Sequence, residues 1–88
     1  PTEFSLEQNY PNPFNPTTLI TYGLQEKSIV NLKIFNLIGE EVVLLLNEEK
    51  AAGVHTLTFN AESLSSGVYF YTLQAGSFTQ TKKMILLR

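Results

Sequence analysis

The residue types that most often carry out catalysis are scarce in this sequence of 88 residues. It contains no Asp, no Cys and a single His, His55. Serines at positions 63, 65 and 66 lack the Gly-x-Ser-x-Gly turn that exposes a nucleophilic serine. Glutamate pairs at 40–41 and 48–49 flank predicted turns, where we expect solvated charges rather than the paired acids of a glycosidase. We therefore predict that the chain is not an enzyme.

Metal and cofactor sites are not expected either. A lone histidine cannot supply the ligand set of a metal site. His55 falls on the predicted inward face beside Leu57, so we expect a hydrogen-bonded structural histidine. No glycine-rich loop that could cradle a phosphate is present. The sequence predicts no catalytic, metal-binding or cofactor-binding residue, and no cofactor.

Two features could bind a partner. Phe35 and Phe70 are predicted to point away from the core, so they could belong to a platform for sugar rings, although core packing accounts for most other aromatic residues. The second feature is the basic and apolar C-terminal end, which contains no acidic residue and carries too few charges for a nucleic-acid surface. We expect its residues to contact a partner: Lys82, Lys83, Met84, Ile85, Leu86, Leu87 and Arg88.

Size and composition predict one small domain held together by apolar packing. Hydrophobic residues make up 43% of the chain, the net charge is -2, and no cysteine is available for a disulfide. No apolar run approaches the roughly 20 residues of a membrane span, and no N-terminal signal peptide is recognisable. Because the chain begins at Pro1, we expect residues 1–88 to be a single domain excised from a longer polypeptide.

Alternation of apolar and polar residues predicts an all-β domain. The expected strands are 4–8, 18–24, 29–36, 41–46, 54–60, 68–74 and 78–87. The segment 41–46 is nearly continuous in apolar residues, so a helix is its alternative, but its short length between turns favours a strand. Seven short strands with a turn about every ten residues predict an immunoglobulin-like antiparallel β-sandwich.

Glycines and one tyrosine mark the predicted turns. Gly39 should supply a positive φ in a hairpin, Gly53 should end a charged loop over 47–53, and Gly67 should end the corner at 62–67. Tyr69 follows that corner and precedes the inward Tyr71 by two residues. This spacing is typical of the tyrosine corner at strand F of immunoglobulin-like domains, in which the hydroxyl bonds to upstream backbone.

The domain is predicted to be organised around a proline-rich crossover between the first two strands. Its central residues are Asn9, Tyr10, Pro11, Asn12, Pro13 and Phe14, and Pro16 follows shortly after. Proline fixes φ and lacks an N–H, so this segment cannot be a helix or a central strand. We expect a stiff, extended crossover with Tyr10 and Phe14 as its two aromatic anchors.

The same segments resemble the C-terminal sorting domains of the type IX secretion system of Bacteroidetes and their relatives. The resemblance covers nearly the whole chain, through the blocks 8–18, 20–22, 34–42, 52–55, 66–71 and 82–88. It implies an immunoglobulin-like domain at the end of an exported protein that passes through the periplasm and is secreted or attached to the cell surface. The implied partners are an N-terminal cargo domain in the same polypeptide, the outer-membrane translocon and a sorting peptidase.

Two other classes of function remain open from the residues alone. A structural spacer or carbohydrate-binding module of an extracellular enzyme would need only the sandwich. An assembly module like that of flagellar hook-capping proteins shares much of the same pattern.

Overall fold

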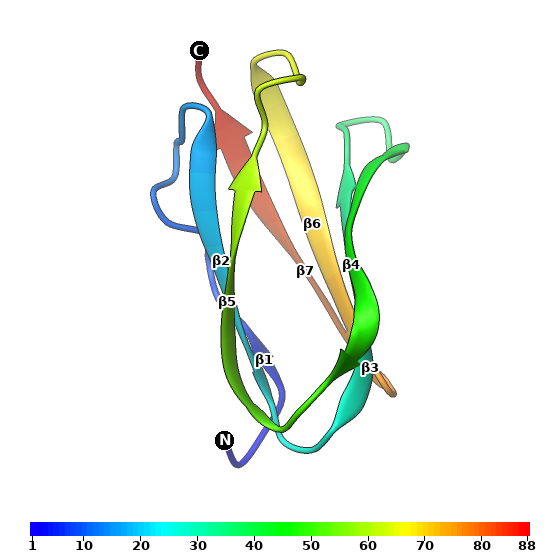
Figure 1. Ribbon diagram of the computed structural model, residues 1–88. Helices are drawn as coiled ribbons and strands as arrows, with labels where there is room; N and C mark the ends of the chain where they lie inside the picture. The colour runs from blue at the N-terminus through cyan, green and yellow to red at the C-terminus, as the bar shows by residue number, and fades with distance from the viewer.

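Seven strands form two antiparallel sheets in the computed structural model, which describes all 88 residues (Figure 1). The strands are β1 (Ser5–Leu6), β2 (Thr17–Leu24), β3 (Ser28–Phe35), β4 (Glu41–Lys50), β5 (Gly53–Asn60), β6 (Gly67–Ala75) and β7 (Phe78–Leu86). One sheet has the order β1-β2-β5 and the other the order β4-β3-β6-β7. The predicted all-β, seven-strand sandwich is confirmed.

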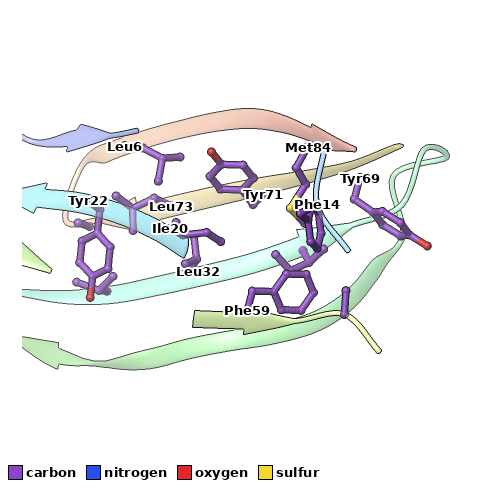
Figure 2. Packing of buried hydrophobic residues seen from close by; sticks show 14 of the residues in the cluster. Leu6, Phe14, Ile20, Tyr22, Leu32, Phe59, Tyr69, Tyr71, Leu73 and Met84 are labelled. Atoms are coloured by element: carbon purple, nitrogen blue, oxygen red, sulfur yellow. The ribbon is translucent and has the colours of Figure 1, made fainter. Parts of the chain in front are cut away.

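The core lies between the two sheets and is built by alternation along the strands (Figure 2). Every second side chain of a strand points to the same face, so the inward residues of β2, β3, β6 and β7 meet in the middle. The buried hydrophobic residues are Leu6, Phe14, Ile20, Tyr22, Leu24, Val30, Leu32, Ile34, Phe59, Ala61, Tyr69, Tyr71, Leu73, Ala75, Met84 and Leu86. No disulfide supports them, so apolar burial is the main stabilising term.

Strand order supports the immunoglobulin-like description. β6 lies between β3 and β7, as strand F lies between strands C and G in immunoglobulin-like sandwiches. The third residue of β6 is the predicted corner tyrosine, Tyr69, which is buried. The first hairpin of this sheet turns at Gly39, whose φ of 86° is the positive value predicted for it.

β4 differs from its prediction. It runs for ten residues to Lys50, so the helix alternative is wrong and residues 47–50 are strand rather than loop. Pairing with β3 continues to Ser28↔Lys50, and the charged side chains remain solvated because β4 is an edge strand. Two register shifts interrupt the ladder, between Leu32 and Lys33 and between Ile34 and Phe35. These irregularities explain why a nearly continuous apolar run could not be assigned to faces from periodicity alone.

The shape of the domain separates the chain ends. Its principal extents are 37 × 23 × 17 Å, and the N- and C-termini lie at opposite ends of the long axis (Figure 1). β1 is shorter than predicted, because regular pairing with β2 ends at Leu6; after that only Glu7 and Tyr10 make backbone hydrogen bonds to β2 before the chain reaches β7. None of the elements is a helix with the length and apolarity that crossing a membrane requires.

Candidate functional site

β7 contains five of the seven residues expected to contact a partner, and these five alternate between the two faces of the sheet. Met84 and Leu86 are fully buried in the core, whereas Lys83 and Ile85 alternate with them and point to the outer face. Lys82 lies on the inward side but is only half-buried, because it is near the open margin of the sandwich. A partner can therefore touch part of this segment only, and the two buried side chains serve the core.

The proline-rich crossover closes part of the free edge of β7. The backbone N–H of Phe14 donates to the carbonyl of Ile85 at 2.9 Å, and the N–H of Leu87 donates to the carbonyl of Phe14 at 3.0 Å. Asn12 Oδ1 accepts the N–H of Ile85 at 2.9 Å, and Gln8 Nε2 donates to the carbonyl of Lys83 at 2.7 Å. The crossover thus forms one parallel backbone bridge to β7, between Phe14 and Leu86, and covers the C-terminal half of its edge.

The first half of this edge has no backbone hydrogen-bond partner, although β1 lies near it and the Phe4 ring stacks on Phe78 with centroids 5.6 Å apart. The backbone N–H and C=O groups of alternate residues point to this edge. Those of Lys83, Ile85 and Leu87 face the crossover, and those of Thr79 and Thr81 point to the same edge in the first half of β7. No strand pairs with them, because β7 is the last strand of its sheet. Residues far upstream in the chain therefore cover the C-terminal half of the β7 edge.

A buried hydrogen-bond network holds the crossover in place. The Tyr71 hydroxyl accepts the N–H of Asn9 and donates to the carbonyl of Glu7, both at 2.7 Å. The Asn9 side chain donates to Thr18 Oγ1 at 2.9 Å and to the carbonyl of Pro11 at 3.2 Å. Asn9 is 2% exposed, so these bonds satisfy groups that water cannot reach.

Burial changes the acidity of the hydroxyl at the centre of this network. It raises the pKa of Tyr71 from 10.0 to about 12, and the hydrogen bond from Asn9 opposes part of the shift. The neutral phenol therefore persists over the whole physiological pH range. It acts as a fixed donor and acceptor rather than as a proton-transfer group.

The crossover has one aromatic anchor instead of the two expected. Phe14 is 2% exposed and lies 6.2 Å from the ring of Phe59, centroid to centroid, in the core shown in Figure 2. Tyr10 is 78% exposed, although its backbone exchanges two hydrogen bonds with Leu19. The second anchor is the polar residue Asn9, which was not predicted as an anchor from the sequence. The only sequence feature that pointed to it was its position before Tyr10 in the proline-rich segment.

Arg88 is hydrogen-bonded within the domain. Its guanidinium donates through Nη1 to the carbonyls of Glu62 and Leu64, and its backbone N–H donates to Ser66 Oγ at 3.0 Å. Charged groups are good donors to carbonyl oxygens, so this contact ties the C-terminal residue to the 61–66 loop. Of the three basic residues expected to face a partner, Lys83 has the most freely exposed charge.

The tyrosine corner is present as predicted. The Tyr69 hydroxyl donates to the carbonyl of Ser65 at 2.7 Å, inside the 62–65 region expected from the spacing. The bond fixes the loop that also receives Arg88.

Replacing Tyr69 by Phe is expected to lower the free energy of unfolding by about 1 kcal/mol, the net value of a typical hydrogen bond. Urea denaturation followed by far-UV circular dichroism measures the change. Tyr10→Phe is the matched control, because its hydroxyl is exposed and has no partner in the protein. A midpoint for Tyr69→Phe equal to that of the control would mean that the hydroxyl contributes nothing.

His55 has a structural environment. Its Nε2 lies 2.8 Å from the carbonyl of Ala51, and its ring stacks on Tyr22 with centroids 5.3 Å apart. The predicted hydrogen bond is confirmed, although the side chain is half-buried rather than enclosed. No group of three or more potential metal ligands surrounds it.

Comparison with known proteins bears directly on this arrangement. A family model described as the secretion system C-terminal sorting domain matches residues 8–87, which include the proline-rich crossover and all of β7. The chain belongs to this family. Its function is that of a sorting signal, which directs the export of the protein that carries it to the medium or the cell surface through the type IX secretion system. This finding favours the sorting domain over the spacer, sugar-binding and hook-cap alternatives.

A solved structure agrees in fold. PorZ, a surface component of the type IX secretion system of Porphyromonas gingivalis, superposes with a TM-score of 0.66 at 17% sequence identity. The match covers 96% of the sorting domain and 12% of the PorZ chain. A search of curated proteins found no match. At this identity the likeness to PorZ concerns the fold, and the functional assignment rests on the family.

Proposed function

We propose that residues 1–88 form a single sorting domain that follows a cargo domain in the same polypeptide. The cargo passes through the periplasm, and the outer-membrane translocon of the type IX system then recognises the sorting domain. Family membership supports the sorting role, and the separation of the chain ends is the structural observation that carries the proposal. A cargo attached at the N-terminus lies at one end of the long axis, so the C-terminal end remains accessible to an exporter.

The surface that the translocon contacts includes the accessible part of β7. Lys83 and Ile85 face outward, Leu87 is 55% exposed, and the edge at Thr79 and Thr81 can accept an added strand. An exposed edge of this kind offers main-chain hydrogen bonds, and the side chains beside it supply specificity. Lys82 lies at the margin of the same surface.

A reporter fusion tests the proposal. Residues 1–88 are placed after a periplasmic reporter in a bacterium with a working type IX system, and reporter is measured in periplasm, surface and medium. We expect the fusion to leave the cell and the unfused reporter to remain in the periplasm. A strain without the translocon is the control, and it should retain both. A folded fusion that stays in the periplasm of the competent strain would contradict the proposal.

Charge variants of the fusion refine the test. Lys82→Gln together with Lys83→Gln should reduce secretion without unfolding the domain, because neither ammonium group takes part in an ion pair. Arg88 is kept, since its guanidinium holds the 61–66 loop. Deletion of 82–88 is unsuitable, because it removes the buried Met84 and Leu86 and would unfold the domain.

A further inference from the structure

The outer face of the four-stranded sheet carries an aromatic pair in register with β7. Phe35 of β3 stands directly opposite Phe70 of β6, and Phe70 stands directly opposite Lys83 of β7. Both phenylalanines alternate with fully buried residues, Ile34 and Tyr71, so their side chains lie on the outer face. Side chains directly opposite one another have Cβ atoms about 5 Å apart, so the three residues form one continuous row.

Neighbouring rows widen this aromatic row into an apolar surface. Val68 of β6 stands opposite Ile85 of β7 on one side of it, and Leu44 of β4 stands opposite Lys33 on the other. Leu44 is 49% exposed, and the other apolar members are half-buried. We call this surface the outer strip; it comprises Phe35, Leu44, Val68, Phe70, Lys83 and Ile85.

The outer strip is confined to one end of the sheet. The row of Leu44 and Lys33 continues into the polar pair Thr72 and Thr81, and the next row pairs Asn31 with Gln74. The other outer face of the sandwich has no aromatic pair: it presents threonines such as the bonded pair Thr21 and Thr56, and the separate apolar side chains Leu19 and Val54. The strip therefore lies toward the C-terminal end of the molecule and away from the N-terminus (Figure 1).

The net charge beside the strip is positive, although Glu41 stands directly opposite Phe35 at the β4 end of the row. Lys33 is paired with Glu41 at 3.5 Å, whereas Lys83 has no acidic partner. An apolar surface of this kind bordered by a free cation fits a partner with apolar side chains and a carboxylate. The aromatic side chains supply large contact areas, and the free ammonium group helps to set orientation.

We propose that the outer strip is part of the surface by which the exporter recognises this domain, and that the exporter's contacting segment is apolar with an acidic side chain. The inference rests on the proposed function and extends it from β7 across β6 and β3. Three observations favour the exporter as the occupant: continuity with the outward residues of β7, the free positive charge, and the distance from the cargo end. Phe35 and Phe70 are thereby specificity-determining residues rather than remnants of the core.

The reporter fusion can distinguish an effect of the outer strip on secretion from an effect of the core on folding. Phe35→Thr combined with Phe70→Thr removes the aromatic contact and keeps residues that favour strands. The matched control is Leu19→Thr combined with Val54→Thr, because these side chains are 45% and 67% exposed on the other sheet. Thermal unfolding of each purified domain establishes that it is folded at the temperature of the assay.

We expect the Phe35/Phe70 variant to lose at least ten-fold in secreted reporter and to accumulate in the periplasm, while the Leu19/Val54 variant matches the parent domain. Lys83→Glu should also reduce secretion, and Lys27→Glu, in the turn at the opposite end, should not. Normal secretion of a folded Phe35/Phe70 variant would overturn the inference and leave the proposed function intact. Failure of the parent fusion to be secreted would instead overturn the proposed function.

Sedimentation of the purified parent domain distinguishes a second possible occupant. We expect a monomer, because the strip is assigned to the exporter. A dimer that the Phe35/Phe70 substitutions convert to a monomer without changing secretion would assign the strip to a second copy of the chain, and this result would also overturn the inference.

Discussion

Replacing Phe14 by Ala is expected to lower the free energy of unfolding by about 3–5 kcal/mol, the usual cost of truncating a buried phenylalanine. Phe14 is 2% exposed and packs near Phe59, although it belongs to a segment outside the named strands. Its backbone also bonds β7 through Ile85 and Leu87. A domain of this size has a total stability of about 4–13 kcal/mol, so the variant should be largely unfolded at physiological temperature or close to it.

Urea denaturation followed by far-UV circular dichroism measures this effect, and Tyr10→Ala is the matched control. The two aromatic residues belong to the same proline-rich segment, but Tyr10 is 78% exposed. The control should change stability by less than about 0.5 kcal/mol, as is usual for surface positions. Equal losses in the two variants would show that the segment is stabilised by its backbone pairing rather than by insertion of the Phe14 ring.

Replacing Tyr71 by Phe is expected to cost about 2–3 kcal/mol, clearly more than the change at Tyr69. The lost hydroxyl accepts the N–H of Asn9 and donates to the carbonyl of Glu7, so both backbone groups lose their partner. A buried polar group left without a partner carries its full desolvation penalty, about 1–3 kcal/mol. Tyr69→Phe loses a single bond to an exposed loop. Because the groups that lose their partner in Tyr71→Phe are more deeply buried, we expect the larger loss of stability there.

The same variant should remove a pH-dependent component of stability. The pKa of Tyr71 is about 12 in the folded protein and 10.0 when the group is unperturbed, so the folded state holds this proton more tightly. The stabilisation is complete below pH 10 and decreases as the pH rises toward 12. The stability difference between the parent protein and Tyr71→Phe should therefore narrow over this interval. A difference that stays constant would contradict the raised pKa.

The Phe14→Ala and Tyr71→Phe substitutions should also affect sorting, because both side chains hold the crossover in its position. Phe14 and Tyr71 together hold the segment that covers the C-terminal half of β7. If the crossover detaches, the edge at Lys83 and Ile85 loses its partners and becomes a template for unwanted strand pairing. Secretion assays on either variant therefore need a parallel measurement of folding.

The amino-acid sequence by itself determined the strands, their inward faces and the tyrosine corner. Alternation with a period of two is a local property, and glycine, proline and polar clusters mark turns without reference to distant residues. The inward sets of β2, β3 and β6 follow directly from it, as does the bond from Tyr69 to a residue four positions upstream. β4 departed from its prediction where register shifts and an exposed edge removed the periodic signal.

Only the tertiary structure decided which crossover residues are anchors and how much of β7 is accessible. Asn9 and Tyr71 are separated by 62 positions in the chain, and Asn12 and Ile85 by 73. Such pairs meet because the two sheets pack face to face and bring the start of the chain beside its end. Local sequence patterns carry no information about contacts between residues so far apart. The resulting contacts bury Asn9 and Phe14, leave Tyr10 in solvent, and restrict the open edge of β7 to its first half.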